Sequence, residues 1–479
     1  MEKKLVSNYL YSTIYQLFLV LIPIITVPYT TRVLGSTPLG INTLSASIVQ
    51  WFVIFGIMGI NMYGNREIAR VRDNKEKLSK TFFEIYLMQF INLCVMVVLY
   101  FIFLKFFKHH YFIEYRLIFF IQAITLISIM FDITWFFYGV EDFKKASIRN
   151  FIIKIINVLC IFTFIKGPED LWLFVTVNTL SAVFGQAIMW VQLKQYIKFT
   201  KVSIKDAYKH FKPNMSLFVP QIAISVYVVL DQTMTGFLSN ADNLAFYQQS
   251  QRFVKMFLLF VTSIGSVMLP RISNTFAKGE NDKAMKYLSG TFKLALYLSI
   301  PMMFGMMAVA PNFISWYLAE AFAPVGPLIS ITAPIIVLIS ISNVFGVQYM
   351  IPAGMSKQYS KSVIFGAITN LIMNAILIPM FGAYGAAIGS IGAELVVTVT
   401  QWLSVRNNLE LNVKFKSVMI YVFSGILMFV AVYLIGYFQS ANFIVNIEQV
   451  LAGAIIYMGM LTITRDEFHI SIIKKILRR

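Results

Sequence analysis

Charged side chains are rare inside the long apolar runs of this sequence, and three of them are basic residues that could bind an anion. Arg252 and Lys255 are three residues apart, so they share one face of a helix. Two cations this close repel each other unless an anionic group such as a phosphate or pyrophosphate lies between them. Arg32 ends the first apolar run. Alternatively, Arg32 is an anchor at a membrane interface, and Arg252 and Lys255 extend to the interface or pair with Asp231 or Asp242.

Carboxylates and amides also lie within apolar runs, and two of each are candidate site residues. An ionised group at the middle of a membrane costs about 2.5 to 3.5 kcal/mol, so each needs a partner, a water-filled cavity or a function. Asp231 could bind H⁺ or Na⁺ and couple transport to an ion gradient, or pair with a cation of a neighbouring helix. Glu394 could also couple transport to an ion, or act as a structural hydrogen-bond or ion-pair partner. Asn370 and Asn374 are one helical turn apart and could donate to sugar hydroxyls or join two helices.

The sequence lacks the motifs that would indicate several kinds of enzyme. It has no Gly-x-x-x-x-Gly-Lys-Ser/Thr loop for ATP and no Asp-x-Asp pair for the metal of a nucleotide sugar. Its four histidines and two cysteines have no metal-ligand spacing. We therefore expect no catalytic residue, no metal site and no cofactor, and hence a protein that is not an enzyme.

The composition indicates that helices inside a membrane must position these polar residues. Of the 479 residues, 58% are hydrophobic and only 13% are charged, whereas soluble proteins carry about 25% charged residues. A chain so poor in polar residues could not cover the surface of a soluble fold. The net charge of +18 could suggest nucleic acid, but the basic residues fall in short clusters between apolar runs. Such clusters are a signal of membrane topology, so no nucleic-acid partner is expected.

Apolar runs long enough to cross about 30 Å of hydrocarbon recur along the whole chain. They predict an all-α polytopic membrane protein with about fourteen transmembrane helices. The connections are short, so no soluble domain is expected. The predicted spans are 10–33, 41–63, 82–104, 117–138, 151–166, 171–191, 215–238, 250–270, 288–310, 327–349, 362–379, 382–404, 418–437 and 444–464.

The distribution of basic residues supports an even number of spans. Cytoplasmic loops of membrane proteins collect Lys and Arg. If the N-terminus is cytoplasmic, 31 of the 40 Lys and Arg residues fall on the cytoplasmic side and five on the outer side. Both termini are therefore predicted to be cytoplasmic, in the plasma membrane or inner membrane of a bacterium.

A weak internal repeat predicts two pseudo-symmetric six-helix bundles followed by two C-terminal helices. The segment that starts at Gly59 and continues to Phe82 parallels the segment from Gly265 to Phe292. Duplicated bundles of this kind surround a central site in many transporters. The predicted division is an N-terminal lobe at 1–200, a C-terminal lobe at 201–410, and spans 13 and 14 with a basic cytoplasmic tail at 411–479.

Four segments resemble bacterial lipid-linked oligosaccharide flippases of the O-antigen or capsule type. These flippases form the polysaccharide transport branch of the multidrug/oligosaccharidyl-lipid/polysaccharide exporter superfamily. The likeness extends over nearly the whole chain. The segments are Val27–Gly35, Trp135–Lys144 with Arg149 and Asn150 after it, Leu269–Ser273, and Asn343–Gln348 followed by Ile351, Pro352 and Gly354.

The resemblance implies a carrier that moves an undecaprenyl-pyrophosphate-linked oligosaccharide repeat unit from the inner to the outer leaflet by alternating access. Related flippases line a central cavity with cations for the pyrophosphate, and Arg32, Arg252 and Lys255 are the matching positions here. With no ATP motif, an H⁺ or Na⁺ gradient, the membrane potential or removal of the product would give the direction. A polysaccharide polymerase and a chain-length regulator are the protein partners that such a role implies.

Other transporter classes stay open at this point. A cation-coupled multidrug antiporter of the same superfamily would have twelve spans and carboxylates deep in one lobe. Spans 13 and 14 argue against it, whereas Asp231 and Glu394 agree with it. A lipid scramblase or a structural scaffold would need no polar cavity. A polysaccharide polymerase would need a large outer loop, which the sequence lacks.

Overall fold

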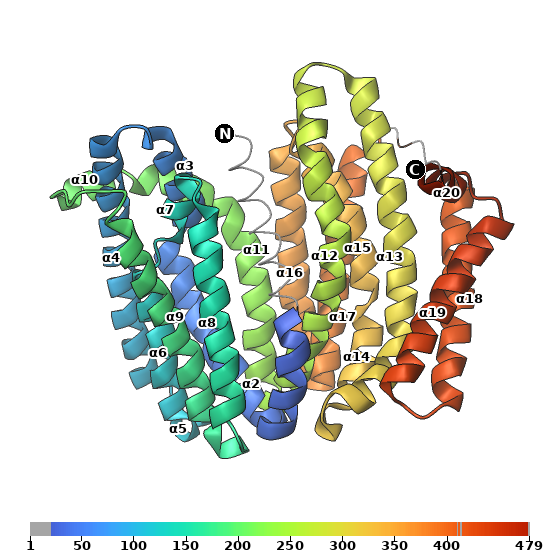
Figure 1. Cartoon of the computed structure of the whole chain (residues 1–479), viewed down its shortest axis with the longest axis horizontal. Helices are drawn as coiled ribbons and strands as arrows, with labels where there is room; N and C mark the ends of the chain where they lie inside the picture. Colours follow the sequence, from blue (N-terminus) through green and yellow to red (C-terminus); the bar gives the residue numbers. More distant parts are fainter. Residues whose placement is uncertain (1–20, 410, 412–413, 478–479) are drawn as a thin grey trace. The chain divides into compact units, whose positions relative to one another are not determined.

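The computed structural model describes residues 21–409, 411 and 414–477, and every regular element in these ranges is a helix (Figure 1). The chain divides into two compact units, Met1–Gly236 and Phe237–Arg479. The all-α part of the predicted fold class is confirmed. The division at 1–200, 201–410 and 411–479 stays a prediction.

The first unit is a set of long helices joined by short connections. Its first described element is an apolar helix at Leu21–Leu34. The later elements are α2 (Ser36–Ile57), α3 (Ile60–Val71), α4 (Lys75–Phe106), α5 (His110–Glu114), α6 (Arg116–Met130), α7 (Thr134–Gly139), α8 (Phe143–Phe164), η1 (Pro168–Asp170), α9 (Leu171–Leu193), α10 (Ile204–Tyr208) and α11 (Phe211–Leu238), within which the first unit ends.

The second unit carries the remaining helices. Its C-terminal helices α18 and α19 pack against α13 through Leu296, Ile300, Met428 and Tyr457. The elements are α12 (Ala241–Ala277), α13 (Asn281–Tyr317), η2 (Glu320–Phe322), α14 (Val325–Thr332), α15 (Pro334–Ser342), η3 (Asn343–Met350), α16 (Ser356–Phe381), α17 (Ala383–Val405), α18 (Phe415–Phe438), α19 (Phe443–Ile463) and α20 (Glu467–Leu477).

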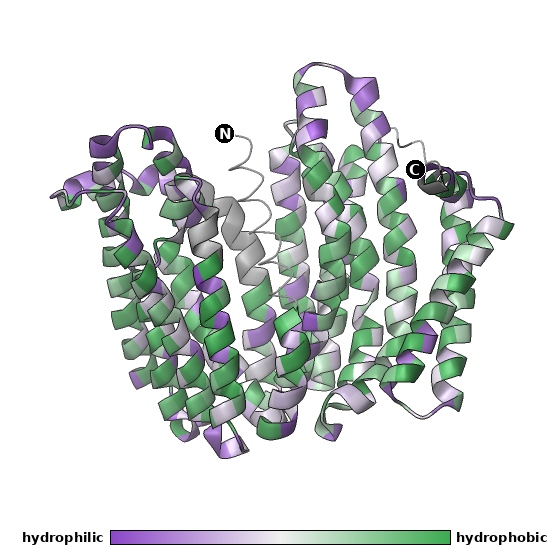
Figure 2. Cartoon of the chain, viewed as in Figure 1, coloured by the Kyte–Doolittle hydropathy of each residue, from purple (hydrophilic) through white to green (hydrophobic). Residues whose placement is uncertain are grey.

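Ten of the described helices are long and apolar enough to cross a membrane, and an eleventh span results if the bent pair at Glu320–Thr332 and Pro334–Met350 counts as one. Hydrophobic residues cover most of the helix shafts, and hydrophilic residues gather at helix ends and loops (Figure 2). Helices α8 and α11 overlap the predicted spans 151–166 and 215–238. Residues 10–20 of the first predicted span lie outside the described part of the chain. The count of fourteen and the two-fold repeat stay predictions.

Several spans are interrupted, and polar side chains satisfy the backbone groups that one interruption frees. Between α6 and α7, Gln89 Nε2 donates to the carbonyl oxygens of Ile129 at 3.1 Å and Asp132 at 2.9 Å. Trp135 Nε1 in turn donates to Gln89 Oε1 at 2.9 Å. A helix end leaves its last carbonyls without helical donors, so these bonds stabilise the break.

The proline positions explain one bend. Pro334 is the first residue of α15, and the two halves of this span differ in direction by 42°. Proline is tolerated at a helix start because its missing N–H has no partner there. Pro301 lies inside the continuous helix α13.

Helices α16 and α17 form a tight hairpin. Gly382 joins them with a φ of +55°, a conformation that favours glycine. A Cβ atom added to Gly385 would lie 2.2 Å from the carbonyl oxygen of Leu377. Small residues at this spacing let two helix backbones approach closely inside a membrane.

Candidate functional site

The predicted anion-binding cations lie in different units. Arg32 is exposed near the end of the helix at Leu21–Leu34 in the first unit. Arg252 and Lys255 lie on α12 in the second unit, where Arg252 is partly buried and Lys255 is exposed. Arg252 Nη1 donates to Gln249 Oε1 at 3.3 Å. The neutral amide of Gln249, one helical turn away, therefore holds the Arg252 guanidinium. Lys255 lies on the same helix.

The two predicted amides are wholly buried in α16. Asn374 Nδ2 donates to Asn370 Oδ1 at 3.1 Å, so the one-turn spacing does produce a hydrogen-bonded pair. Asn374 Oδ1 lies 2.2 Å from the position that a Cβ atom would take on Gly389 of α17. This location is what the helix-joining alternative expects. Contact with a sugar would require the α16 and α17 hairpin to open.

The two predicted ion-coupling carboxylates also belong to different units. Asp231 lies in α11 and is only 4% exposed. Thr235 Oγ1 donates to the main-chain oxygen of Asp231 at 2.7 Å. Glu394 lies in α17 and is partly buried. A buried carboxylate in a membrane helix can take up a cation, and Asp231 meets that requirement better than Glu394 does.

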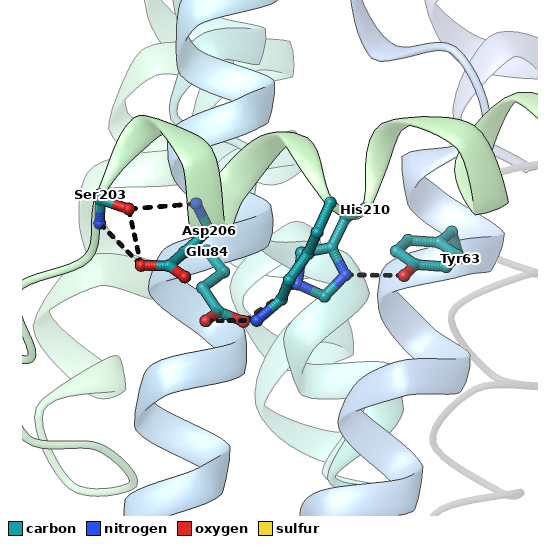
Figure 3. A network of polar contacts seen from close by, with 6 residues as sticks. Tyr63, Glu84, Ser203, Asp206 and His210 are labelled. Carbon is teal, nitrogen blue, oxygen red and sulfur yellow. Dashed lines mark hydrogen bonds and ion pairs between the residues drawn. The ribbon is translucent and has the colours of Figure 1, made fainter.

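The structure adds a polar cluster that the sequence did not indicate (Figure 3). His210, in the connection between α10 and α11, lies between Tyr63 of α3 and Glu84 of α4. The distance from Tyr63 Oη to His210 Nδ1 is 2.6 Å, and that from His210 Nε2 to Glu84 Oε2 is 3.0 Å. Lys209 Nζ lies 2.7 Å from Glu84 Oε1. We define these four residues as the His210 cluster.

The hydrogen-bond acceptors of the His210 cluster determine which nitrogen of His210 carries the proton. An ionised carboxylate only accepts hydrogen bonds, so His210 Nε2 carries a proton and donates it to Glu84. In the neutral ring Nδ1 then accepts from the Tyr63 hydroxyl. Every polar atom of the imidazole has a partner, and Glu84 is balanced by Lys209, whose side chain is 49% exposed. The cluster thereby fixes the start of α11 to α3 and α4.

The neighbouring helix α10 has its own cap. Ser203 Oγ donates to Asp206 Oδ2 at 2.7 Å and accepts from the Asp206 N–H at 3.1 Å. This is a capping box, which satisfies backbone donors at the first turn of a helix. The bonds from Ser203 also lower the pKa of Asp206.

A second histidine cluster lies at α20. His469 Nδ1 is 2.9 Å from Tyr297 Oη, and His469 Nε2 is 3.0 Å from Thr462 Oγ1. The His469 N–H donates to Asp466 Oδ1 at 2.9 Å, which caps the start of α20. Lone histidines far apart in the sequence gave no signal of either cluster. For the His210 cluster, Glu84 was the available clue, because it is a carboxylate near the start of an apolar run.

The burial of His469 predicts a pH dependence of stability. Burial lowers the pKa of His469 below its ordinary value of 6.5, and Asp466 opposes this only in part. Below about pH 6.5 the unfolded chain therefore binds more protons at this position than the folded chain does, so the free energy of unfolding falls as the pH drops. We expect the thermal midpoint in detergent to fall from about pH 7 to pH 5.5, and His469→Gln to reduce this fall.

The control for this prediction is His110→Gln, which changes an exposed histidine at the start of α5. Tryptophan fluorescence would follow unfolding in all three proteins. His110→Gln should keep the pH dependence of the parent chain. An equal pH dependence in His469→Gln and the parent would contradict the assignment.

Two family models match the chain. The model described as polysaccharide biosynthesis protein matches residues 5–276, and the one described as lipid II flippase MurJ matches residues 203–451. Each match extends over more than half of the chain. A candidate O-antigen transporter of Escherichia coli (strain K12) is 23% identical over 422 residues, which cover 84% of this chain and 96% of the relative. A second such transporter, from Shigella dysenteriae, is 24% identical and covers 81% and 96%.

The fold is also that of a solved flippase. A structure of the lipid II flippase MurJ in an inward closed conformation superimposes with a TM-score of 0.77 and 16% identity. The match covers 96% of this chain and 99% of that chain. A multidrug transporter of the MATE family in an inward-facing conformation matches at a TM-score of 0.58, with 81% of this chain covered. The relatives are transporters and flippases, and the helices described above are those of a multi-pass membrane protein.

Proposed function

Since the chain belongs to the polysaccharide biosynthesis protein family, among the lipid-linked flippases of the multidrug/oligosaccharidyl-lipid/polysaccharide exporter superfamily, we propose that it carries an undecaprenyl-pyrophosphate-linked oligosaccharide from the inner to the outer leaflet of a bacterial cell membrane. The match of the polysaccharide biosynthesis model over more than half of the chain carries this proposal. The product would serve O-antigen, capsule or exopolysaccharide assembly. No covalent bond is made or broken.

The physical task explains why a protein is needed. Without a carrier, a charged pyrophosphate and many hydroxyl groups would have to cross hydrocarbon without hydrogen-bond partners. A cavity that offers cations and amides replaces the lost water, while the lipid tail stays in the bilayer. Arg32, Arg252 and Lys255 are the proposed pyrophosphate contacts, and Asn370 and Asn374 are the proposed sugar contacts.

We propose alternating access as the mechanism, with both termini cytoplasmic. The bend of 42° between the two halves of one span supports a helix that can change shape. The membrane potential supplies about 2.3 kcal/mol per charge per 100 mV, enough to give direction to a coupled step. Asp231 and Glu394 are the proposed H⁺ or Na⁺ sites. A polysaccharide polymerase and a chain-length regulator are the proposed partners that consume the product.

The experiment that tests the proposal is flipping of a fluorescent undecaprenyl-pyrophosphate oligosaccharide in proteoliposomes. A reagent that cannot cross the bilayer would quench only headgroups in the outer leaflet. We expect transfer at a rate well above that of protein-free vesicles. Transfer at the protein-free rate for several glycans, together with export of a cationic dye down a proton or Na⁺ gradient, would instead establish a drug antiporter.

A further inference from the structure

The interruption between α2 and α3 places two helix ends against each other inside one span. Helix α2 ends at Ile57 and α3 begins at Ile60. Met58 has a φ of 52°, a left-handed conformation that a residue with a side chain rarely adopts. The Ile54 carbonyl oxygen still accepts from the Met58 N–H at 3.0 Å. The carbonyls of the last three residues of α2 lose the donors that a continuous helix would supply, and this end of the helix carries a partial negative charge. The break therefore offers carbonyl oxygens to a ligand.

Asn214 of α11 lies directly against this break. Its Oδ1 and main-chain oxygen are 2.9 Å and 3.0 Å from the position that a Cβ atom would take on Gly59. The side chain is wholly buried, and within the described part of the chain neither Oδ1 nor Nδ2 has a hydrogen-bond partner. Buried amides nearly always have partners, because leaving one unpaired is unfavourable. The amide thus points to a ligand that the surrounding side chains do not supply.

The surroundings of Asn214 are polar on one side and apolar on the other. One turn away lies the His210 cluster (Figure 3). The Asn214 N–H donates to the His210 carbonyl oxygen at 3.0 Å, and the Tyr63 N–H donates to the Gly59 carbonyl oxygen at 2.9 Å. The apolar side consists of Ile54, Phe218 and Val229. Glu84, the carboxylate of the His210 cluster, is already bonded to Lys209 and His210.

We propose that this break is a binding site for a monovalent cation of the Na⁺ class. Asn214 Oδ1 and the last carbonyls of α2 are its ligands. Uncharged oxygens suit alkali cations, and the unwound C-terminal end of a half-helix is a recurring place for them in transporters. The site is separate from Asp231 and Glu394, and it does not depend on the lipid-linked substrate.

Thermal unfolding of the purified full chain in detergent tests the site, with NaCl, KCl and choline chloride compared at equal ionic strength. We expect NaCl to raise the thermal midpoint in a saturable manner and choline chloride not to do so. Asn214→Asp adds a negative charge to the ligand set, so the Na⁺ concentration at half-saturation should fall at least about tenfold. Asn214→Leu should lose the Na⁺ response.

The matched control is Asn157→Leu, which removes another buried amide of the same unit. Asn157 Nδ2 already donates to Asn178 Oδ1 and Ser181 Oγ, each at 3.2 Å, so this variant should keep the Na⁺ response of the parent. If Asn214→Leu does not fold, the change in the Na⁺ concentration at half-saturation in Asn214→Asp tests the proposal. An equal response in Asn214→Leu and the parent would overturn the proposal. A higher thermal midpoint in Asn214→Asp with an unchanged Na⁺ dependence would also overturn it. That result would mean that the new carboxylate only stabilises the start of α3.

Discussion

Replacing both Arg252 and Lys255 by alanine is expected to lower the initial rate of lipid-linked oligosaccharide transfer in proteoliposomes about 100-fold. A hydrogen bond to a charged group contributes about 1.5 to 3 kcal/mol. Losing two such contacts with the pyrophosphate raises the barrier by about 3 kcal/mol, and each 1.4 kcal/mol is a factor of ten in rate. Arg252 carries the larger share, because it is partly buried and already oriented by Gln249 at 3.3 Å.

The control for this double variant removes two charges from exposed positions of the same unit. Lys278 and Lys286 lie in the α12 to α13 region and are both exposed. Lys278→Ala with Lys286→Ala should keep the rate within about twofold of the parent, because exposed charges interact weakly through water. Equal losses in the two double variants would indicate a general effect of surface charge. A parent rate in the Arg252 and Lys255 variant would remove these residues from the substrate site.

Helix positions could be predicted from the sequence because each span is marked by the apolar residues of one continuous segment. A long apolar run is more stable in the membrane than in water, independently of the segments that pack against it. Accordingly, the structure has a helix in the described part of every predicted span. The closeness of α16 and α17 was also local in origin, since Gly385 and Gly389 mark where a side chain cannot fit. The interruption at Met58 was not predictable in this way, because no proline accompanies it.

The polar clusters could not be predicted from the sequence, because their residues come from distant segments. Tyr63, Glu84 and His210 come from three elements, and no spacing relates them. Only packing brings them together. The same holds for Asn214, whose importance comes from Gly59 opposite it rather than from its neighbours in sequence. Asn370 and Asn374 illustrate the converse, since their one-turn spacing predicted a shared face but not that this face meets α17.

The hairpin of α16 and α17 gives the largest expected effect on stability. In Gly385→Ala the new Cβ would lie 2.2 Å from the oxygen and 2.4 Å from the carbon of the Leu377 carbonyl. These are backbone atoms, so no side chain can rotate away and the two helices must separate. We expect the free energy of unfolding to fall by about 3 kcal/mol, at the upper end of the usual cost of overpacking. Chemical denaturation in detergent, followed by tryptophan fluorescence, measures the change.

Gly290→Ala in α13 is the matched control, because it makes the same substitution in a helix where nothing lies within 4 Å of the new Cβ. Alanine is the better helix former by about 1 kcal/mol, so this variant should be as stable as the parent or slightly more stable. The two substitutions therefore shift stability in opposite directions if close helix approach is what requires Gly385. An equal loss of stability in both variants would mean that the effect is not specific to the hairpin. No loss in either variant would mean that the hairpin yields to an extra methyl group. Asn374 would then be free to separate from Gly389 and reach a sugar, which is the condition that the proposed substrate role of α16 requires.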